Sequence, residues 1–140
     1  MKTIAILGTL DTKGEEHAFV AGLIRQRGHQ TLLIDAGTLG DPTVAPDVPR
    51  ADIIGDQQFA DRGAAVAAMA EAAAVFCAKL VAEKKIDGII SLGGGGGTAI
   101  GTAAMRALPV GFPKLMVSTL AASESAPSYM GVKDVTLMPS

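Results

Sequence analysis

The 140-residue chain is long enough to bury one hydrophobic core, and its hydrophobic content of 49% excludes a disordered protein. A net charge of −2, with no Trp, one Tyr and four Phe, supplies neither the basic surface nor the stacking rings of a nucleic-acid binder, so we expect no nucleic-acid partner. No apolar run approaches the roughly 18 residues of a membrane span, and Asp11 comes too early for a signal peptide, so we expect a cytoplasmic protein with no membrane partner.

The first third of the chain predicts a strand, a helix and a second strand. Residues 3–8 are apolar, which is typical of a parallel strand buried on both faces. In the polar loop that follows, Asp11 or Thr12 is placed to cap a helix that continues to about Arg27. The apolar face of this helix is expected to hold Phe19, Val20, Leu23 and Ile24. A second strand, residues 31–35, completes a βαβ unit.

The histidines and the single cysteine are expected to have structural roles. His17 and His29 lie on or beside the predicted surface helix, away from the strand ends. No cluster of Cys, His or carboxylates has the spacing of metal ligands, so we expect no metal site. Cys77 lies in an alanine-rich helical pattern, which favours a small core residue over a nucleophile.

The middle of the chain predicts a long loop and a long helix. Residues 36–58 contain several prolines and glycines without sustained periodicity, and we interpret them as a functional flap, with a short strand at residues 51–54 as an alternative. Residues 61–85 have high helix propensity and an apolar stripe formed by Val66, Met69, Ala73, Phe76, Leu80 and Val81. Alanine on the other faces indicates close packing against the sheet or against a second subunit.

The last third alternates strands with shorter elements. Strands are predicted at residues 86–92, 114–119 and 134–138, with a helix over residues 98–107 and a small-residue segment at residues 121–128. Alternation of this kind predicts a three-layer α/β fold, Rossmann-like or flavodoxin-like, with a parallel sheet in the order 2-1-3-4-5. In that order the switch point falls between strands 1 and 3, where open sheets bind ligands.

Two glycine-bearing loops leave the carboxyl ends of those two strands. Five successive glycines follow the third strand, and ordering each costs roughly 0.5–1 kcal/mol, so we expect a ligand to offset the loss. A phosphate is the simplest one, because backbone N–H groups and a helix N-terminus attract anions; a hinge or a plain tight turn is the alternative. Neither loop matches G-x-x-x-x-G-K-[ST] or G-x-G-x-x-G.

The candidate binding residues come from both loops and from two neighbouring strand ends. Lys13 is expected either to approach the phosphates or to be a solvated surface lysine. Asp11 is expected either to cap the helix or to hold Mg²⁺ through water. Asp35 is expected either to bind ribose or to form a turn. No catalytic constellation is recognisable, so no reaction is assigned. The complete candidate set is Gly8, Thr9, Asp11, Thr12, Lys13, Asp35, Gly93, Gly94, Gly95, Gly96, Gly97, Thr98, Ser118 and Thr119.

Three blocks of the chain also resemble a known family. They are the segment from Gly8 to Glu15, the glycine run ending at Thr98, and residues 104–119. Together they resemble the uncharacterised bacterial and plant family that includes a tobamovirus-resistance protein of tomato. The resemblance implies an ATP-binding, Rossmann-like N-terminal domain, with Lys13 and the glycine loop in the matching motifs. It also implies that residues 1–140 are one domain of a longer, two-domain protein.

These observations favour a nucleotide-binding domain that takes ATP, with or without Mg²⁺, and self-associates as a homodimer. Two alternatives remain open. One is an assembly module whose glycine loop is purely structural. The other is a phosphate-ester enzyme domain that does not use ATP.

Overall fold

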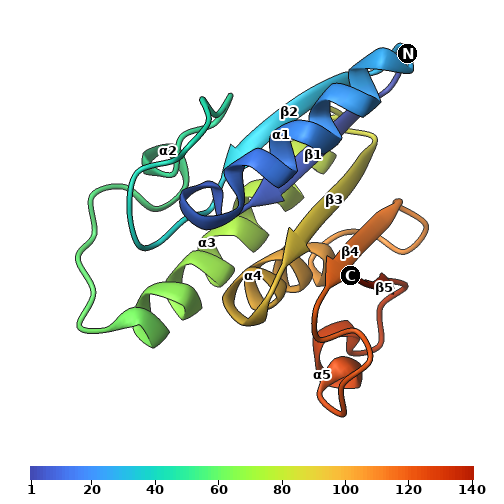
Figure 1. Cartoon of the computed structure of the whole chain (residues 1–140). Helices are drawn as coiled ribbons and strands as arrows, with labels where there is room; N and C mark the ends of the chain where they lie inside the picture. The colour runs from blue at the N-terminus through green and yellow to red at the C-terminus, as the bar shows by residue number, and fades with distance from the viewer.

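The computed structural model describes residues 1–140 and contains one five-stranded, fully parallel sheet (Figure 1). Its strand order is β2-β1-β3-β4-β5, which confirms the predicted Rossmann-like or flavodoxin-like topology. The strands are β1 (Thr3–Gly8), β2 (Gln30–Asp35), β3 (Gly88–Gly93), β4 (Lys114–Ser118) and β5 (Thr136–Pro139).

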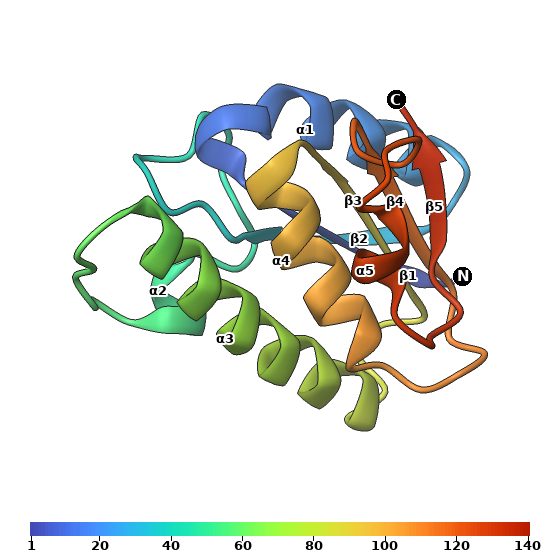
Figure 2. The ribbon, with the colours of Figure 1, turned by 90° about the horizontal axis from the view of Figure 1, so that it is seen from below.

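Helices cover both faces of this sheet and make three layers (Figure 2). The helices are α1 (Leu10–Gln26), α2 (Ala51–Ile54), α3 (Arg62–Ala82), α4 (Gly95–Arg106) and α5 (Ala126–Met130). Successive residues of a strand point to opposite faces, and β1 follows this rule. Ile6 packs in a small cluster with residues of α1, whereas Ala5 and Leu7 belong to the larger cluster formed with α3 and α4.

The buried face of α1 differs from the predicted one. Leu10, Gly14, His17 and Ala21 are buried, whereas Phe19 is 68% exposed and Leu23 is 42% exposed. The other two predicted residues, Val20 and Ile24, are partly buried, and Ile24 packs against the small cluster. The buried residues follow the same spacing of three and four, but they include two small residues and a histidine, which a search for large apolar side chains overlooks. The predicted cap is also wrong, because the helix begins at Leu10 and Thr9 forms no side-chain cap.

The long helix α3 is close to its prediction. Asp61 caps it by accepting the Ala64 N–H at 2.8 Å, and Ala65, Met69, Ala73, Cys77 and Leu80 are buried. Burial raises the pKa of the Cys77 thiol to about 12, so the thiol stays protonated, in agreement with a core residue. We expected no segment of the chain to be long and apolar enough to span a membrane, but α3 is so by length and composition. Core helices of other proteins can be equally long and apolar.

Three other predicted boundaries change. Residues 51–54 form the one-turn helix α2, so the alternative of a strand there is wrong; a single bridge from Val48 to Ile34 is the only strand-like pairing of the flap. α4 begins at Gly95 rather than Thr98, so three glycines form its first turn. The predicted small-residue segment, residues 121–128, overlaps the start of α5, which runs from Ala126 to Met130.

A buried lysine joins β4 to the segment before β5. The Lys114 side chain is 0% exposed, and its Nζ donates to the carbonyls of Pro109 and Phe112 and to Asp134 Oδ1 at 2.6 Å. The lysine therefore has three acceptors, which offset the burial of its charge. The hydrogen bond from Lys114 lowers the pKa of Asp134 from 3.8 to about 2.

Candidate functional site

The carboxyl ends of β1 and β3 face a cavity of about 210 Å³. Two of its walls are Thr9 with the first turn of α1, where the sequence predicted a loop, and the first turn of α4. The cavity therefore lies at the predicted switch point. Eight of the predicted site residues line it: Thr9, Asp11, Thr12, Lys13, Gly94, Gly95, Gly96 and Gly97. The remaining walls come from Thr38, Leu39, Arg62, Val66 and Ile100, which the sequence analysis did not select.

The glycine run is not explained by backbone conformation. None of its residues has a positive φ angle, whereas Gly28, Gly55, Gly111 and Gly131 do. A side chain at Gly93 would collide with the backbone, because its Cβ would lie 2.8 Å from the Gly97 carbonyl carbon. The fold therefore requires glycine at position 93.

The next four glycines have room for a side chain. A Cβ at Gly95 would have no neighbour within 4 Å, and a Cβ at Gly96 would lie 3.6 Å from Val66 Cγ2. At Gly94 and Gly97 the nearest atoms would be 3.7 and 3.6 Å away, which is ordinary van der Waals contact. At Gly95, Gly96 and Gly97 alanine would suit the first turn of α4 better, since glycine is roughly 1 kcal/mol less favourable in a helix. Gly94 is the N-cap residue, a position where glycine is preferred over alanine. Neither the packing nor the backbone geometry of this chain demands these four glycines.

The same turn offers unpaired hydrogen-bond donors. The N–H groups of Gly95, Gly96 and Gly97 have no acceptor within the chain, and the first bond of the turn runs from the Thr98 N–H to the Gly94 carbonyl. Such groups carry the positive end of the helix dipole. Because Gly94–Gly97 line the cavity without side chains, an anion can approach these donors closely.

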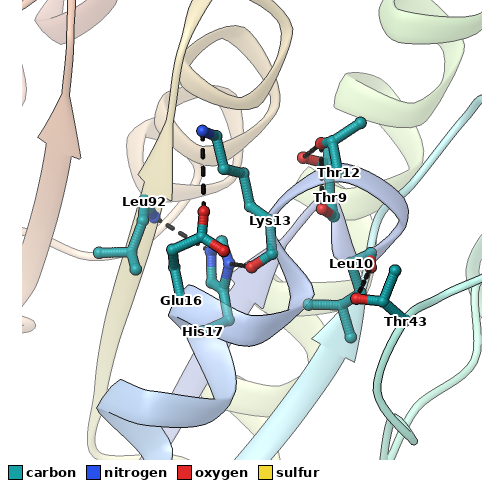
Figure 3. Close-up of polar contacts among 8 residues, drawn as sticks. All are labelled: Thr9, Leu10, Thr12, Lys13, Glu16, His17, Thr43 and Leu92. Carbon is teal, nitrogen blue, oxygen red and sulfur yellow. Dashed lines mark hydrogen bonds and ion pairs between the residues drawn. The ribbon is translucent and has the colours of Figure 1, made fainter.

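The opposite wall bends at Lys13, whose φ of −128° and ψ of 27° interrupt α1. The hydroxyls of Thr9 and Thr12 lie 2.9 Å apart, and the Lys13 ammonium lies 3.7 Å from Glu16 (Figure 3). Both members of this ion pair are about half exposed, and such pairs contribute little. The Lys13 side chain can therefore exchange Glu16 for an anion in the cavity.

His17 connects the first turns of α1 to the end of β3, contrary to the prediction that it lies away from the strand ends. Its side chain is fully buried; Nδ1 donates to the Lys13 carbonyl at 2.7 Å, and Nε2 accepts the Leu92 N–H at 3.2 Å (Figure 3). Glycine at position 8 makes room for the ring, since a Cβ there would lie 2.1 Å from Nε2. Burial lowers the pKa of His17, which favours the neutral ring that this pair of bonds needs.

Two predicted carboxylates hold the segment after β2 instead of facing open space. Asp35 is 1% exposed, and its Oδ1 accepts the N–H groups of Leu10 and Gly37. Burial raises the pKa of Asp35. Asp11 Oδ2 accepts the N–H groups of Leu39 and Gly40 at 2.8 and 3.0 Å. Both carboxylates thus fix the residues that form one side of the cavity.

The predicted residues at the end of β4 lie beneath the glycine turn. The hydroxyls of Thr98 and Ser118 are buried and 2.6 Å apart, and Ser118 Oγ also accepts the Leu120 N–H. The Thr119 N–H donates to the Gly93 carbonyl at 3.1 Å. These three residues support the turn from below and do not line the cavity.

Arg62 is the main cavity residue that the sequence analysis missed. It is exposed at the first position of α3, lines the cavity and takes part in none of the three ion pairs of the chain. A cation at a helix N-terminus opposes the dipole at a cost of about 0.3–1 kcal/mol. The unfavourable position of Arg62 is the signal that could have identified it. It can be recognised in the sequence once the start of the helix is known.

Comparison with known proteins identifies the group to which this architecture belongs. The model of an uncharacterised protein family (UPF0261), N-terminal domain, matches residues 2–140. A UPF0261 protein of Clostridium tetani is 45% identical over 98% of this chain, and one of Mesorhizobium japonicum is 47% identical over 100% of it. The tomato ToMV resistance protein Tm-1(GCR237) is 32% identical over 96% of the chain. The chain spans 36% of the length of each of the two bacterial relatives and 21% of the tomato protein.

Proposed function

We propose that this chain, which belongs to the uncharacterised UPF0261 family, binds the phosphates of a nucleotide, with ATP as the candidate, in the cavity between the first turn of α1 and the first turn of α4. The observation that carries the proposal is the run Gly94–Gly97, which has free space for side chains and yet has none. A phosphate held against the backbone N–H groups supplies the missing reason for these glycines.

The charges around the cavity support the same proposal. Arg62 and Lys13 place two cations on its walls, and the dipole of α4 adds a third positive contribution. Asp11 is the one carboxylate on the wall, and one of its oxygens is occupied by backbone N–H groups. Positive groups therefore outnumber negative ones on the walls of the cavity, which favours a polyanion such as a triphosphate. ATP is proposed with or without Mg²⁺.

The experiment that tests this function is calorimetric titration with ATP, ADP and inorganic phosphate, each with and without Mg²⁺. We expect ATP to bind more tightly than phosphate, and Arg62→Gln to weaken the binding of ATP at least several-fold. Arg27→Gln is the matched control, because Arg27 is also exposed and lies at the C-terminal end of α1. Absence of binding by all three ligands, or an equal loss in both variants, contradicts the proposal.

A second candidate function is self-association through α3, favoured by one surface feature. The groove between α3 and α4 is mainly apolar, with a volume of about 480 Å³, and includes Val66, Ala67, Ala70 and Ala99. A second copy of the chain is the proposed occupant, giving a homodimer. Sedimentation at tens of micromolar tests it: we expect a dimer that Ala70→Glu converts to a monomer, and a monomeric wild type contradicts it.

A further inference from the structure

A second and larger cavity adjoins the one proposed to hold phosphates. Its volume is about 440 Å³, and it lies between the segment after β2, α2, and the start of α3. Thr38, Leu39 and Arg62 line both cavities, so the two spaces meet at these residues. The larger volume falls within the range of small-molecule sites, about 300–1,000 Å³, whereas the smaller one suits only part of such a molecule.

The lining of the second cavity differs in chemistry from that of the first. Leu39, Ile54, Phe59 and Met69 give it apolar walls. Its polar side chains include the amides of Gln57 and Gln58 and the carboxylate of Asp56, all from the segment between α2 and α3. Its second arginine, Arg50, already donates to the carbonyls of Gly37 and Gly40. A flat group with apolar faces and a polar edge fits this lining better than a second polyanion does.

We propose that the second cavity binds the nucleoside of the nucleotide whose phosphates lie against Gly94–Gly97. This inference rests on the proposed function and adds the orientation of the ligand. The base and ribose enter the space walled by Phe59, Ile54 and Met69, and Arg62 stands at the junction beside the phosphates. The class of ligand is therefore a nucleoside polyphosphate, in contrast to a free phosphate or an inorganic polyphosphate.

The other positions open to a nucleoside are less suitable. Asp35, expected either to bind ribose or to form a turn, is 1% exposed, and its Oδ1 is occupied by two backbone N–H groups, one of them from Gly37 two residues later. On the other side of the glycine turn, Ser118 is buried and bonded to Thr98, and neither residue lines a cavity beside the phosphates. The α3–α4 groove also adjoins the phosphate cavity, because Arg62, Val66, Gly95 and Gly96 line both. Apart from Arg62, however, this groove is lined by glycine, alanine and valine, so it offers no other polar side chain to a base or a ribose. The space over α2 and the start of α3 also continues from the phosphate cavity, and it combines apolar walls with side-chain amides.

The test compares ATP with tripolyphosphate, which has the same phosphate chain and no nucleoside. We expect wild-type protein to bind ATP at least tenfold more tightly than tripolyphosphate. Phe59→Ala is expected to weaken ATP binding at least fivefold, because a base loses an aromatic contact, and to leave tripolyphosphate binding unchanged. Phe19→Ala is the matched control, since Phe19 is 68% exposed on α1 and lines neither cavity.

The outcomes separate this inference from the proposed function. Equal affinity of wild-type protein for ATP and tripolyphosphate overturns the nucleoside site and leaves the phosphate site standing. Failure of both ligands to bind overturns both. Retained tripolyphosphate binding shows that a variant is folded; if Phe59→Ala loses it, Gln57→Ala replaces that variant, because Gln57 is an exposed loop residue of the same cavity. An unchanged preference for ATP in the folded variant also overturns the inference.

Discussion

Replacing Gly95 and Gly96 together by alanine is expected to stabilise the free protein. Both residues lie in the first turn of α4, and neither new Cβ would come closer than 3.6 Å to another atom. Alanine is favoured over glycine in helices and loses less backbone entropy on folding, by roughly 0.5–1 kcal/mol per site. The two substitutions together therefore increase the free energy of unfolding by about 1–2 kcal/mol, which raises the Tm of a domain of this size by roughly 3–8 °C.

The same double substitution is expected to remove nucleotide binding. The two methyl groups occupy the space through which a phosphate reaches the N–H groups of the turn. Loss of even one charge-assisted hydrogen bond costs about 1.5–3 kcal/mol, which corresponds to at least a tenfold rise in Kd. Higher stability and lower affinity then appear in one variant, a combination that damage to the fold does not produce.

The assay combines thermal unfolding of the free protein with calorimetric titration of ATP. Gly22→Ala is the control, because Gly22 lies within α1 and a Cβ there would have no neighbour within 4 Å. It should raise the Tm in the same way and leave ATP affinity unchanged. A double variant that binds ATP normally refutes the assignment of the phosphates to this turn. A lower Tm shows that the fold itself needs the glycines.

Three further predictions concern the contacts that support the site and the sheet. His17→Leu should destabilise the protein by about 1–3 kcal/mol, because the Leu92 N–H loses its acceptor. Burial lowers the pKa of His17 below 6.5, so as the pH falls below 6.5 the unfolded chain binds a proton at this residue before the folded chain does. Urea titrations should therefore show that the free energy of unfolding of the wild type decreases below pH 6.5. The His17→Leu variant should not show this decrease. Gly8→Ala should cost roughly 1–3 kcal/mol by collision with the His17 ring, and a urea double-mutant cycle with His17→Ala should show that the two costs are not additive. Asp134→Asn should lower the Tm above pH 4, where wild-type Asp134 is ionised beside Lys114, and the difference should vanish as the pH falls towards 2, through the lowered pKa.

The topology could be predicted because it depends on patterns that are local in sequence. Apolar strands alternating with helical segments allow few right-handed arrangements, and β2-β1-β3-β4-β5 is one of them. Once the order is known, the loops after β1 and β3 must meet, which brings Lys13 and the glycine turn to one cavity. That part of the site required no knowledge of side-chain packing.

The residues that the sequence analysis missed or misplaced depend on contacts between distant segments. His17 and Leu92 are 75 positions apart, and no local pattern marks a histidine that bonds to the end of β3. The segment after β2 is likewise held by Asp11 and Arg50, from the preceding and following elements. Its position determines where the two cavities meet, so the second cavity could not be foreseen from the sequence.

Two local rules of helix formation are broken on opposite walls of the cavity between α1 and α4. α4 begins with three glycines that neither sterics nor φ requires, and α3 begins with an arginine that opposes its dipole. Each feature alone lowers stability slightly and has several explanations. They come from segments more than thirty residues apart in sequence and border one space of about 210 Å³. The proposed binding of a polyanion would account for both together, because a polyanion would use the bare backbone donors of one helix and the free guanidinium of the other.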